Sequence, residues 1–162
     1  MPRLEQATRS GTPYFNVMDH RKDISKKWME MDEFLRFTGN LDPDLKEEVR
    51  RAVAQESGCK FCASLGDPKA SFDDPRVAAA VRFGTVVAQS PKGIPDAEFD
   101  ALRPHFSPEE IVELSCWVSF MYAAEMFGAI MNLDPATDGV KKMYAAWLLQ
   151  GKQKKTAPAS AA

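Results

Sequence analysis

The stretch LDPDLKEEVRRAVAQESGCKFC, residues 41–62, combines a helix start, an apolar helix face and a pair of cysteines. Asp42 suits the N-cap position and Pro43 the first helical position. The apolar residues that recur at helical spacing are Leu45, Val49, Val53 and Ala54. Gly58 is suited to the left-handed conformation that ends helices, so it should stop this helix immediately before Cys59. The stretch therefore predicts a helix after Asp42 and a second, short helix that carries the cysteines.

The remaining sequence favours helices as well, because alternating β-branched runs are absent and apolar residues recur at helical spacing. Ser107-Pro108-Glu109-Glu110 matches the capping box that opens helices. The further helices that we expect lie at about 24–38, 75–90, 95–102, 108–132 and 137–150. The fold class predicted is all-α, with short connections that favour antiparallel neighbours. We expect one domain over residues 1–150 and a flexible tail over 151–162, whose composition offers nothing to pack.

Composition excludes several classes of partner. The chain has 162 residues and a net charge of −2, which gives no electrostatic case for nucleic acid. The beginning of the sequence lacks an apolar signal core, so a cytoplasmic location is expected. The longest apolar stretch, 111–131, is interrupted by Glu113 and Glu125, which argues against a membrane span. We expect it to be a core helix.

Cys59 and Cys62 are the strongest candidates for chemistry. Two residues three apart on a helix have Cβ atoms about 5–6 Å apart, which small adjustments bring within disulfide distance. The amides and dipole of a helix start, with Lys60 nearby, should lower a thiol pKa there. Two alternatives remain: a pair of merely buried small residues, or half of a zinc site. The zinc site would need a second cysteine pair, and neither His20 nor His105 has ligand spacing.

Three other residues bear on function. Cys116 stands alone among apolar residues and is expected to be an inert, buried thiol. Glu47 lies about 16 Å back from Gly58 along its helix, so it would need an intermediary near position 66 to act on Cys62. Taken alone, a glutamate such as Glu47 is more often part of a solvated helix face than a catalytic carboxylate. Glu125, in an apolar helix, is predicted to pair with an arginine, line a pocket or face solvent, and the sequence does not decide among these.

The spacing of Glu47, Cys59 and Cys62 resembles the pattern Glu-x11-Cys-x2-Cys-x3-His of the carboxymuconolactone decarboxylase/AhpD-like superfamily. The flanking segments 15–20 and 105–110 are similar to that family as well. The resemblance implies an all-helical domain around an antiparallel helical hairpin, assembled as a trimer or hexamer. Self-association also agrees with an apolar content of 10 Phe, 3 Trp and 8 Met.

The resemblance also implies a thiol peroxidase mechanism without cofactor or metal. Cys62 would attack a small hydroperoxide to give a sulfenic acid, and Cys59 would resolve it into a disulfide. A dithiol reductant, lipoyl-linked in the best-known family members, would then restore both thiols. In the family, the carboxylate that matches Glu47 acts through the motif histidine, but here that position is Gly66. Two alternatives therefore stay open: a non-enzymatic, redox-responsive oligomer, and a decarboxylase-type enzyme that does not need the cysteines.

Overall fold

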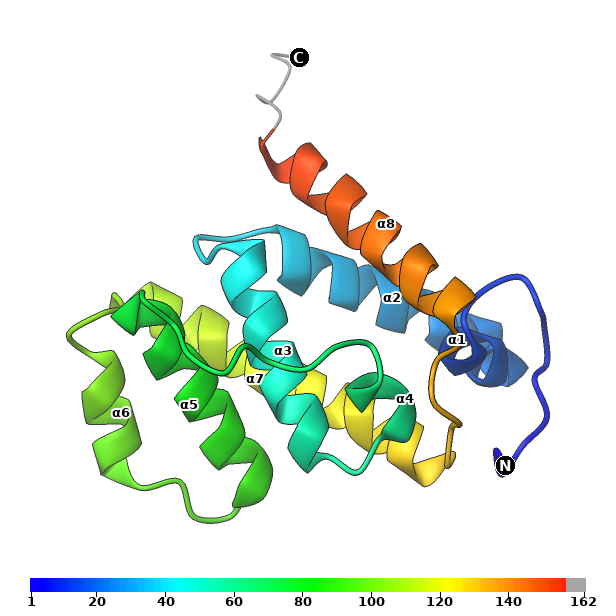
Figure 1. Ribbon diagram of the computed structural model, residues 1–162, viewed down its shortest axis with the longest axis horizontal. Helices are drawn as coiled ribbons and strands as arrows, with labels where there is room; N and C mark the ends of the chain where they lie inside the picture. The colour runs from blue at the N-terminus through cyan, green and yellow to red at the C-terminus, as the bar shows by residue number, and fades with distance from the viewer. Residues whose placement is uncertain (157–162) are drawn as a thin grey trace.

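The computed structural model describes residues 1–156, and that part of the chain is all-α (Figure 1). Its elements, in chain order, are α1 (Pro13–Met18), the 3-10 helix η1 (Asp19–Arg21), α2 (Lys22–Phe37), α3 (Pro43–Glu56), α4 (Lys60–Ala63), α5 (Pro75–Gln89), α6 (Asp96–Leu102), α7 (Pro108–Ile130) and α8 (Asp138–Thr156). The all-α prediction is confirmed, and no strand occurs in the described residues. Within the same residues, no helix is long and apolar enough to cross a membrane.

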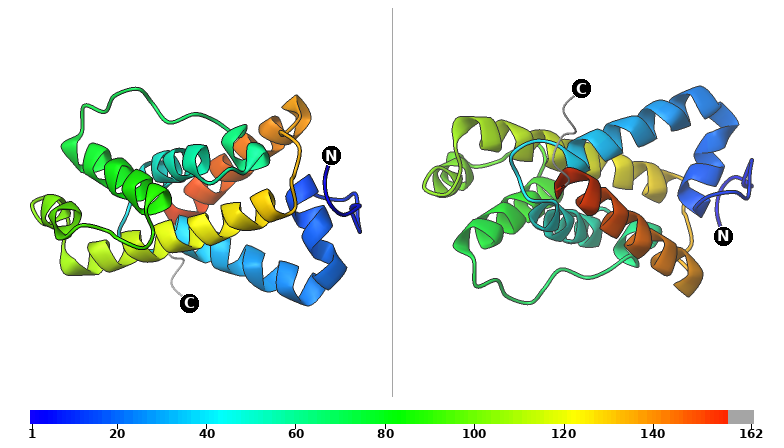
Figure 2. Two further views of the ribbon diagram at one scale, coloured as in Figure 1. Left: turned by 90° about the horizontal axis from the view of Figure 1, so that it is seen from below. Right: turned by 90° about the horizontal axis from the view of Figure 1, so that it is seen from above.

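Helix α7 packs along the long helices α2, α3 and α5, whereas α8 packs on α2 (Figure 2). Helix α2 runs antiparallel to it, because Trp28 stacks near Phe120 whereas the later residue Asn40 contacts the earlier Glu113. Helices α3 and α5 run in the same direction as α7. For example, α5 contacts α7 first at Arg76 and Glu110 and then at Gly84 and Val118. Antiparallel packing is thus present between α2 and α7, which are distant in the sequence. Helices α3 and α5 can run in the same direction because a long connection over 57–74 joins them.

Two apolar clusters hold the helices together. The larger one lies between α3, α5 and α7 and contains the fully buried Val49, Val53 and Trp117. Gly84 lets α5 approach closely, because a Cβ at this position would press on side-chain atoms of Val49 and Val53. The smaller cluster surrounds the cysteines, with members from α1, α4 and the segment after α7: Tyr14, Val17, Met18, Ala54, Phe61, Leu133 and Ala136. The cysteines therefore belong to a core of their own.

The capping signals located most helix starts correctly. Asp42 caps α3 by accepting from the amide of Asp44, and Ser107 with Glu110 forms the expected capping box of α7. Gly58 has a φ of 75° and follows α3, as predicted. The cysteine helix is shorter than expected, since α4 ends at Ala63 and not at Gly66.

Several predictions about packing are wrong. Helix α1 was not expected. The spacing of Ile24, Trp28, Met31 and Leu35 predicts one apolar face of α2, but only Trp28 and Leu35 pack against the core clusters, whereas Ile24 and Met31 are exposed. The buried residues of α2 are Ser25 and Arg36. Helix α8 continues to Thr156, and Gly151 is buried against the ring of Phe37, so the predicted tail begins too early. The rest of that tail, 157–162, lies outside the described residues.

The prediction that Cys116 is a buried thiol is also wrong, because this free cysteine is exposed. Its neighbours Leu114, Trp117 and Val118 point inward from α7. Two residues after Leu114, a side chain is turned about 200° around the helix, onto the opposite face. The apolar residues around Cys116 in the sequence therefore do not bury it.

Candidate functional site

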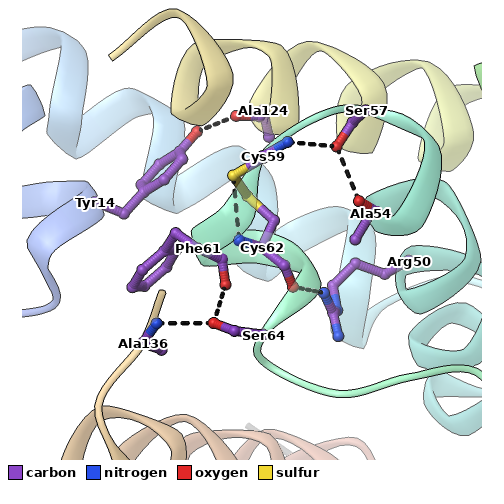
Figure 3. Close-up of a disulfide and its surroundings, with 10 residues drawn as sticks. All are labelled: Tyr14, Arg50, Ala54, Ser57, Cys59, Phe61, Cys62, Ser64, Ala124 and Ala136. Atoms are coloured by element: carbon purple, nitrogen blue, oxygen red, sulfur yellow. Dashed lines mark hydrogen bonds between the residues drawn. A yellow bond between two sulfur atoms is a disulfide. The ribbon is translucent and has the colours of Figure 1, made fainter. Parts of the chain in front are cut away.

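Cys59 and Cys62 form a disulfide at the start of α4 (Figure 3). Cys59 is the N-cap residue of this helix, and the Cys62 amide donates a hydrogen bond to Sγ of Cys59 over 3.1 Å. The Cys59 amide in turn donates to Oγ of Ser57. The prediction that helix-start amides surround the pair is confirmed. An amide that points at Sγ of Cys59 would stabilise a thiolate there after the disulfide opens.

Helix α7 touches the disulfide through Gly128. A Cβ at this position would overlap Sγ of Cys59 and would come within 3.3 Å of Sγ of Cys62. The absent side chain is therefore what allows the helix backbone to lie against both sulfurs. On the other side, Tyr14 donates a hydrogen bond from its hydroxyl to the Ala124 carbonyl over 2.8 Å, which brings its ring beside the pair (Figure 3).

A cavity of about 340 Å³ opens beside the disulfide. Its wall includes Cys62 and seven aromatic residues: Tyr14, Phe15, Trp28, Phe61, Phe120, Tyr144 and Trp147. Although Cys62 is itself 6% exposed, the exposed residues Met29 and Met143 also line the cavity, so the cavity reaches the surface. A small, largely apolar molecule in this cavity would therefore lie next to Cys62.

At one side of this cavity, Glu47 is buried and surrounded by donors. Its carboxylate accepts from Arg36 at 2.9 Å, Arg50 at 2.9 Å, Arg51 at 3.2 Å and the Tyr144 hydroxyl at 2.8 Å. Burial alone would raise the pKa of Glu47, but the charges of Arg50 and Arg36 and these hydrogen bonds lower it to about 2. Glu47 is thus ionised throughout the physiological pH range. The alternative of a solvated helix face is wrong.

Arg50 joins this cluster to the cysteines. One of its Nη atoms donates to the Cys62 carbonyl over 3.1 Å (Figure 3). Its Nε and the other Nη atom bind Glu47. An intermediary between Glu47 and Cys62 was predicted near position 66, and the structure has Arg50 instead. Gly66 lies beside Arg51, not between the two residues. A guanidinium stays protonated in proteins, so this link orients groups and does not relay protons.

Glu125 has the opposite surroundings, although it is equally buried. It lines the cavity together with Cys62, it is 3% exposed, and neither carboxylate oxygen has a hydrogen-bond partner among the described residues. Burial raises the pKa of Glu125 to about 8, against the lowering effects of the Arg50 charge, the nearby Ser57 hydroxyl and the Arg36 charge. The carboxyl group is therefore mainly protonated at neutral pH. Of the three environments left open by the sequence, pocket lining is the one observed.

Sequence analysis missed several residues that shape the site. Arg50 was within reach of inference, because a residue three positions after Glu47 shares its helix face. Arg36 and Tyr144 had no local signal, because they meet Glu47 only through the packing of α2 and α8. No group of three or more His, Cys, Asp or Glu side chains in residues 1–156 is arranged to hold a metal ion.

Comparison with known proteins adds information on the fold. No protein-family model matches the sequence, and no curated protein sequence matches it. Among solved structures, the chain is similar to the apo crystal structure of the debrominase Bmp8, with a TM-score of 0.69 and 14% identity. The match covers 85% of this chain and 83% of that chain. The helical fold is therefore shared with an enzyme, while fold alone does not fix chemistry.

Proposed function

We propose that this chain is an AhpD-like thiol-dependent oxidoreductase that reduces small hydroperoxides. The observation that carries the proposal is that a disulfide-forming cysteine, Cys62, is part of the wall of an apolar cavity that reaches the surface. A vicinal thiol pair can store two electrons, and the cavity gives a substrate access to one sulfur of that pair. The spacing of Glu47, Cys59 and Cys62 supports the same family of reactions.

The two cysteines have different roles in this proposal. Cys62 faces the cavity, so its thiolate attacks the hydroperoxide and becomes a sulfenic acid. Cys59 is packed against Gly128 and away from the cavity, so it condenses with that sulfenic acid and forms the disulfide. A dithiol reductant, such as a lipoyl group, then attacks Cys62, and Cys59 leaves as a thiolate that the Cys62 amide stabilises.

The aromatic lining favours an apolar substrate over hydrogen peroxide. Burial of apolar surface contributes roughly 25 cal/mol per Å², so a cumyl-sized group should gain more affinity in the cavity than hydrogen peroxide can. Release of the alcohol product leaves the disulfide for reduction. We therefore expect a higher kcat/KM for cumene hydroperoxide than for hydrogen peroxide.

A peroxidase assay with matched cysteine variants tests the proposal. Consumption of cumene hydroperoxide with dihydrolipoamide should disappear in Cys62→Ser. It should be unchanged in Cys116→Ser, which removes the exposed thiol on the outer face of α7. Cys59→Ser should instead accumulate a sulfenic acid that a dione probe traps. Equal turnover in the wild type and Cys62→Ser would contradict the proposal. Turnover of a small-molecule substrate that is retained when both Cys59 and Cys62 are Ser would contradict it too, and would favour decarboxylase-type chemistry.

Reductive removal of a halogen is a second candidate function. The aromatic side chains that line the cavity could pack against an aromatic ring of a substrate, and the fold is shared with a debrominase. The dithiol would supply two electrons, hydrogen would replace the halogen, and the halide would leave as the disulfide forms. Bromide release from a brominated aromatic compound, measured in the same Cys62→Ser and Cys116→Ser variants, distinguishes this reaction from peroxide reduction.

We also propose that the protein acts as a cytoplasmic homo-oligomer, a trimer or a hexamer. Large apolar side chains are exposed on α2, α7 and α8, among them Phe34 at 61%, Val112 at 62% and Leu149 at 58%. Exposed apolar area of this kind is typical of interfaces. A monomer in light scattering at micromolar concentration would refute the oligomer, while leaving the cysteine chemistry untouched.

A further inference from the structure

Glu125 is placed where a proton donor would serve both cysteines. It lies three residues before Gly128 on α7, so both residues face the same side of the helix. Gly128 is in contact with the two sulfurs, and Glu125 is therefore one turn away from the disulfide. Glu125 also shares the cavity wall with Cys62, and its two buried oxygens have no partner among the described residues. Burying an unpartnered carboxyl is costly, so its retention in the reactive cavity needs a reason.

We propose that Glu125 is the general acid of the Cys59–Cys62 couple and protonates the atom that leaves in each step. This proposal rests on the proposed function, because it assigns a proton source to the same cysteine chemistry. The proposal also explains how the site can have a proton donor although Gly66 occupies the position where the resembling family has a histidine. In this chain the acid approaches the sulfurs from α7 and not from the helix that carries the cysteines.

In the oxidation step, the Cys62 thiolate attacks the terminal oxygen of the hydroperoxide. The sulfur–oxygen bond forms and the oxygen–oxygen bond breaks, so the sulfur is oxidised and the peroxide reduced by two electrons. The alkoxide takes the proton of Glu125 and leaves as an alcohol. When Cys59 then attacks the sulfenic acid, its thiol proton passes through the Glu125 carboxylate to the departing hydroxide, which leaves as water. The carboxyl group regains its proton from solvent.

In the reduction step, a thiolate of the dithiol attacks Cys62 and the disulfide bond breaks. Cys59 leaves with the electron pair of that bond, and Glu125 protonates it. A second attack, by the other thiol of the reductant on the mixed disulfide, releases Cys62 and the oxidised dithiol. This step does not involve peroxide, and it therefore gives a second, independent measure of what Glu125 does.

Apart from the thiols of Cys59 and Cys62 in the reduced protein, and from Glu33 at the mouth of the cavity, the other ionisable groups around the cavity leave Glu125 as the group that titrates near pH 8. Those groups are Tyr14 from α1, Asp32 and Arg36 from α2, Glu47 and Arg50 from α3, and Tyr144 from α8. Burial raises the pKa of both tyrosines, and the arginine pKa values are raised by their acidic partners against the effect of burial. Glu47 ionises near pH 2. Burial raises the pKa of Asp32 as well, although its hydrogen bonds with Arg36 oppose this, so Asp32 needs its own control.

The first experiment measures single-turnover oxidation of the reduced protein by cumene hydroperoxide between pH 6 and 9.5. In the wild type, the rate expressed per Cys62 thiolate, with the thiolate fraction measured separately by its ultraviolet absorbance, should fall as Glu125 loses its proton, around pH 8. Glu125→Gln should be slower by about 10²-fold at pH 7, and its rate should not fall on the alkaline side. Glu125→Asp should keep the alkaline fall at a reduced rate. Glu109→Gln, an exposed position on the same helix, and Asp32→Asn should both retain the fall.

The second experiment measures opening of the Cys59–Cys62 disulfide by dithiothreitol, with the rate expressed per thiolate. The same alkaline fall should appear in the wild type and be absent in Glu125→Gln. Identical profiles for these two proteins would overturn the role of Glu125, whether or not peroxide is a substrate. Loss of the fall in Asp32→Asn alone would overturn it too. If the profiles differ but no hydroperoxide is consumed, the proposed peroxidase function fails while the acid role in disulfide exchange is supported.

Discussion

Two carboxylates in this molecule are buried to the same 3% exposure and have opposite environments. Glu47 is held by three guanidinium groups and a tyrosine hydroxyl, whereas Glu125 has no hydrogen-bond partner among the described residues and faces the cavity. The pKa of Glu47 is consequently lowered to about 2 and that of Glu125 raised to about 8. Burial by itself acts in the same direction on both, so the difference comes from their partners.

This difference separates two tasks that one residue cannot perform together. A carboxylate that is always ionised can orient Arg50, which in turn holds the Cys62 carbonyl, but it cannot donate a proton near neutral pH. A carboxyl whose pKa lies near the working pH can donate one. The family pattern would assign proton transfer to the position of Glu47. Here we propose that Glu47 is a positioning residue and that Glu125 transfers the proton.

Removal of Glu47 should have the largest effect on stability. Glu47→Ala would leave Arg50 buried without its carboxylate, while Arg36 would keep only Asp32, and breaking a buried ion pair in this way typically costs about 3–5 kcal/mol. We expect that decrease in the free energy of unfolding, measured by urea denaturation. Glu30→Ala removes an exposed carboxylate that pairs with Lys27 and should cost less than about 1 kcal/mol. If Glu47→Ala lowers the free energy of unfolding no more than this control does, the ion pairs of Glu47 contribute little to stability.

The pH dependence of stability should distinguish the two carboxylates. The folded pKa of Glu125 lies above its ordinary value of 4.5, so the folded state binds the extra proton between pH 4.5 and 8. Its stabilising contribution is complete below pH 4.5 and is lost as the pH rises to 8, by at most about 1.4 kcal/mol per pH unit. Glu47 has a lowered pKa, so its contribution is present above pH 4.5 and is lost as the pH falls toward 2.

Urea denaturation at a series of pH values measures both effects. Glu125→Gln should remove the decline between pH 4.5 and 8 and leave the acid-side loss intact, because glutamine cannot ionise. Glu109→Gln, at an exposed position on the same helix, should leave the decline as it is in the wild type. A decline of equal slope in Glu125→Gln would mean that another group titrates in this range.

The sequence predicted the backbone of the site better than its chemistry. Asp42, Gly58 and Ser107 act through contacts with their own neighbours, and local signals of this kind place helix ends reliably. The cysteine pair at a helix start followed from the same reasoning. Burial was harder to predict, as Cys116 shows, because apolar neighbours in the sequence do not determine which face of a helix points inward.

Contacts between distant segments were beyond the sequence. Tyr144 reaches Glu47 across 97 positions, and Gly128 meets Cys59 because α7 passes behind α4. The environment of Glu125 depends on α1, α2, α3 and α8 together, so its protonation state required the packed structure. The sequence is compatible with three environments for Glu125, and only the packing of the helices against one another determines which of them is present.

The smallest effect on turnover is expected at position 66, where this chain has Gly66 and the family that its sequence resembles has a histidine. Gly66 has a φ of 146°, and a Cβ here would come within 3.2 Å of Nε of Arg51, so Gly66→His should destabilise the fold by about 1–3 kcal/mol. Because Glu47 is already held by Arg36, Arg50 and Tyr144, the new imidazole would find no free carboxylate to complete a relay. We therefore expect kcat/KM for cumene hydroperoxide to change by less than about tenfold, well short of the 10²–10⁴-fold typical of general acid–base catalysis. Gly93→His, at an open loop position, is the matched control for adding an imidazole. A gain of 10²-fold or more in Gly66→His alone would show that Glu47 can still drive a histidine relay, and the division of tasks between the two carboxylates would then be wrong.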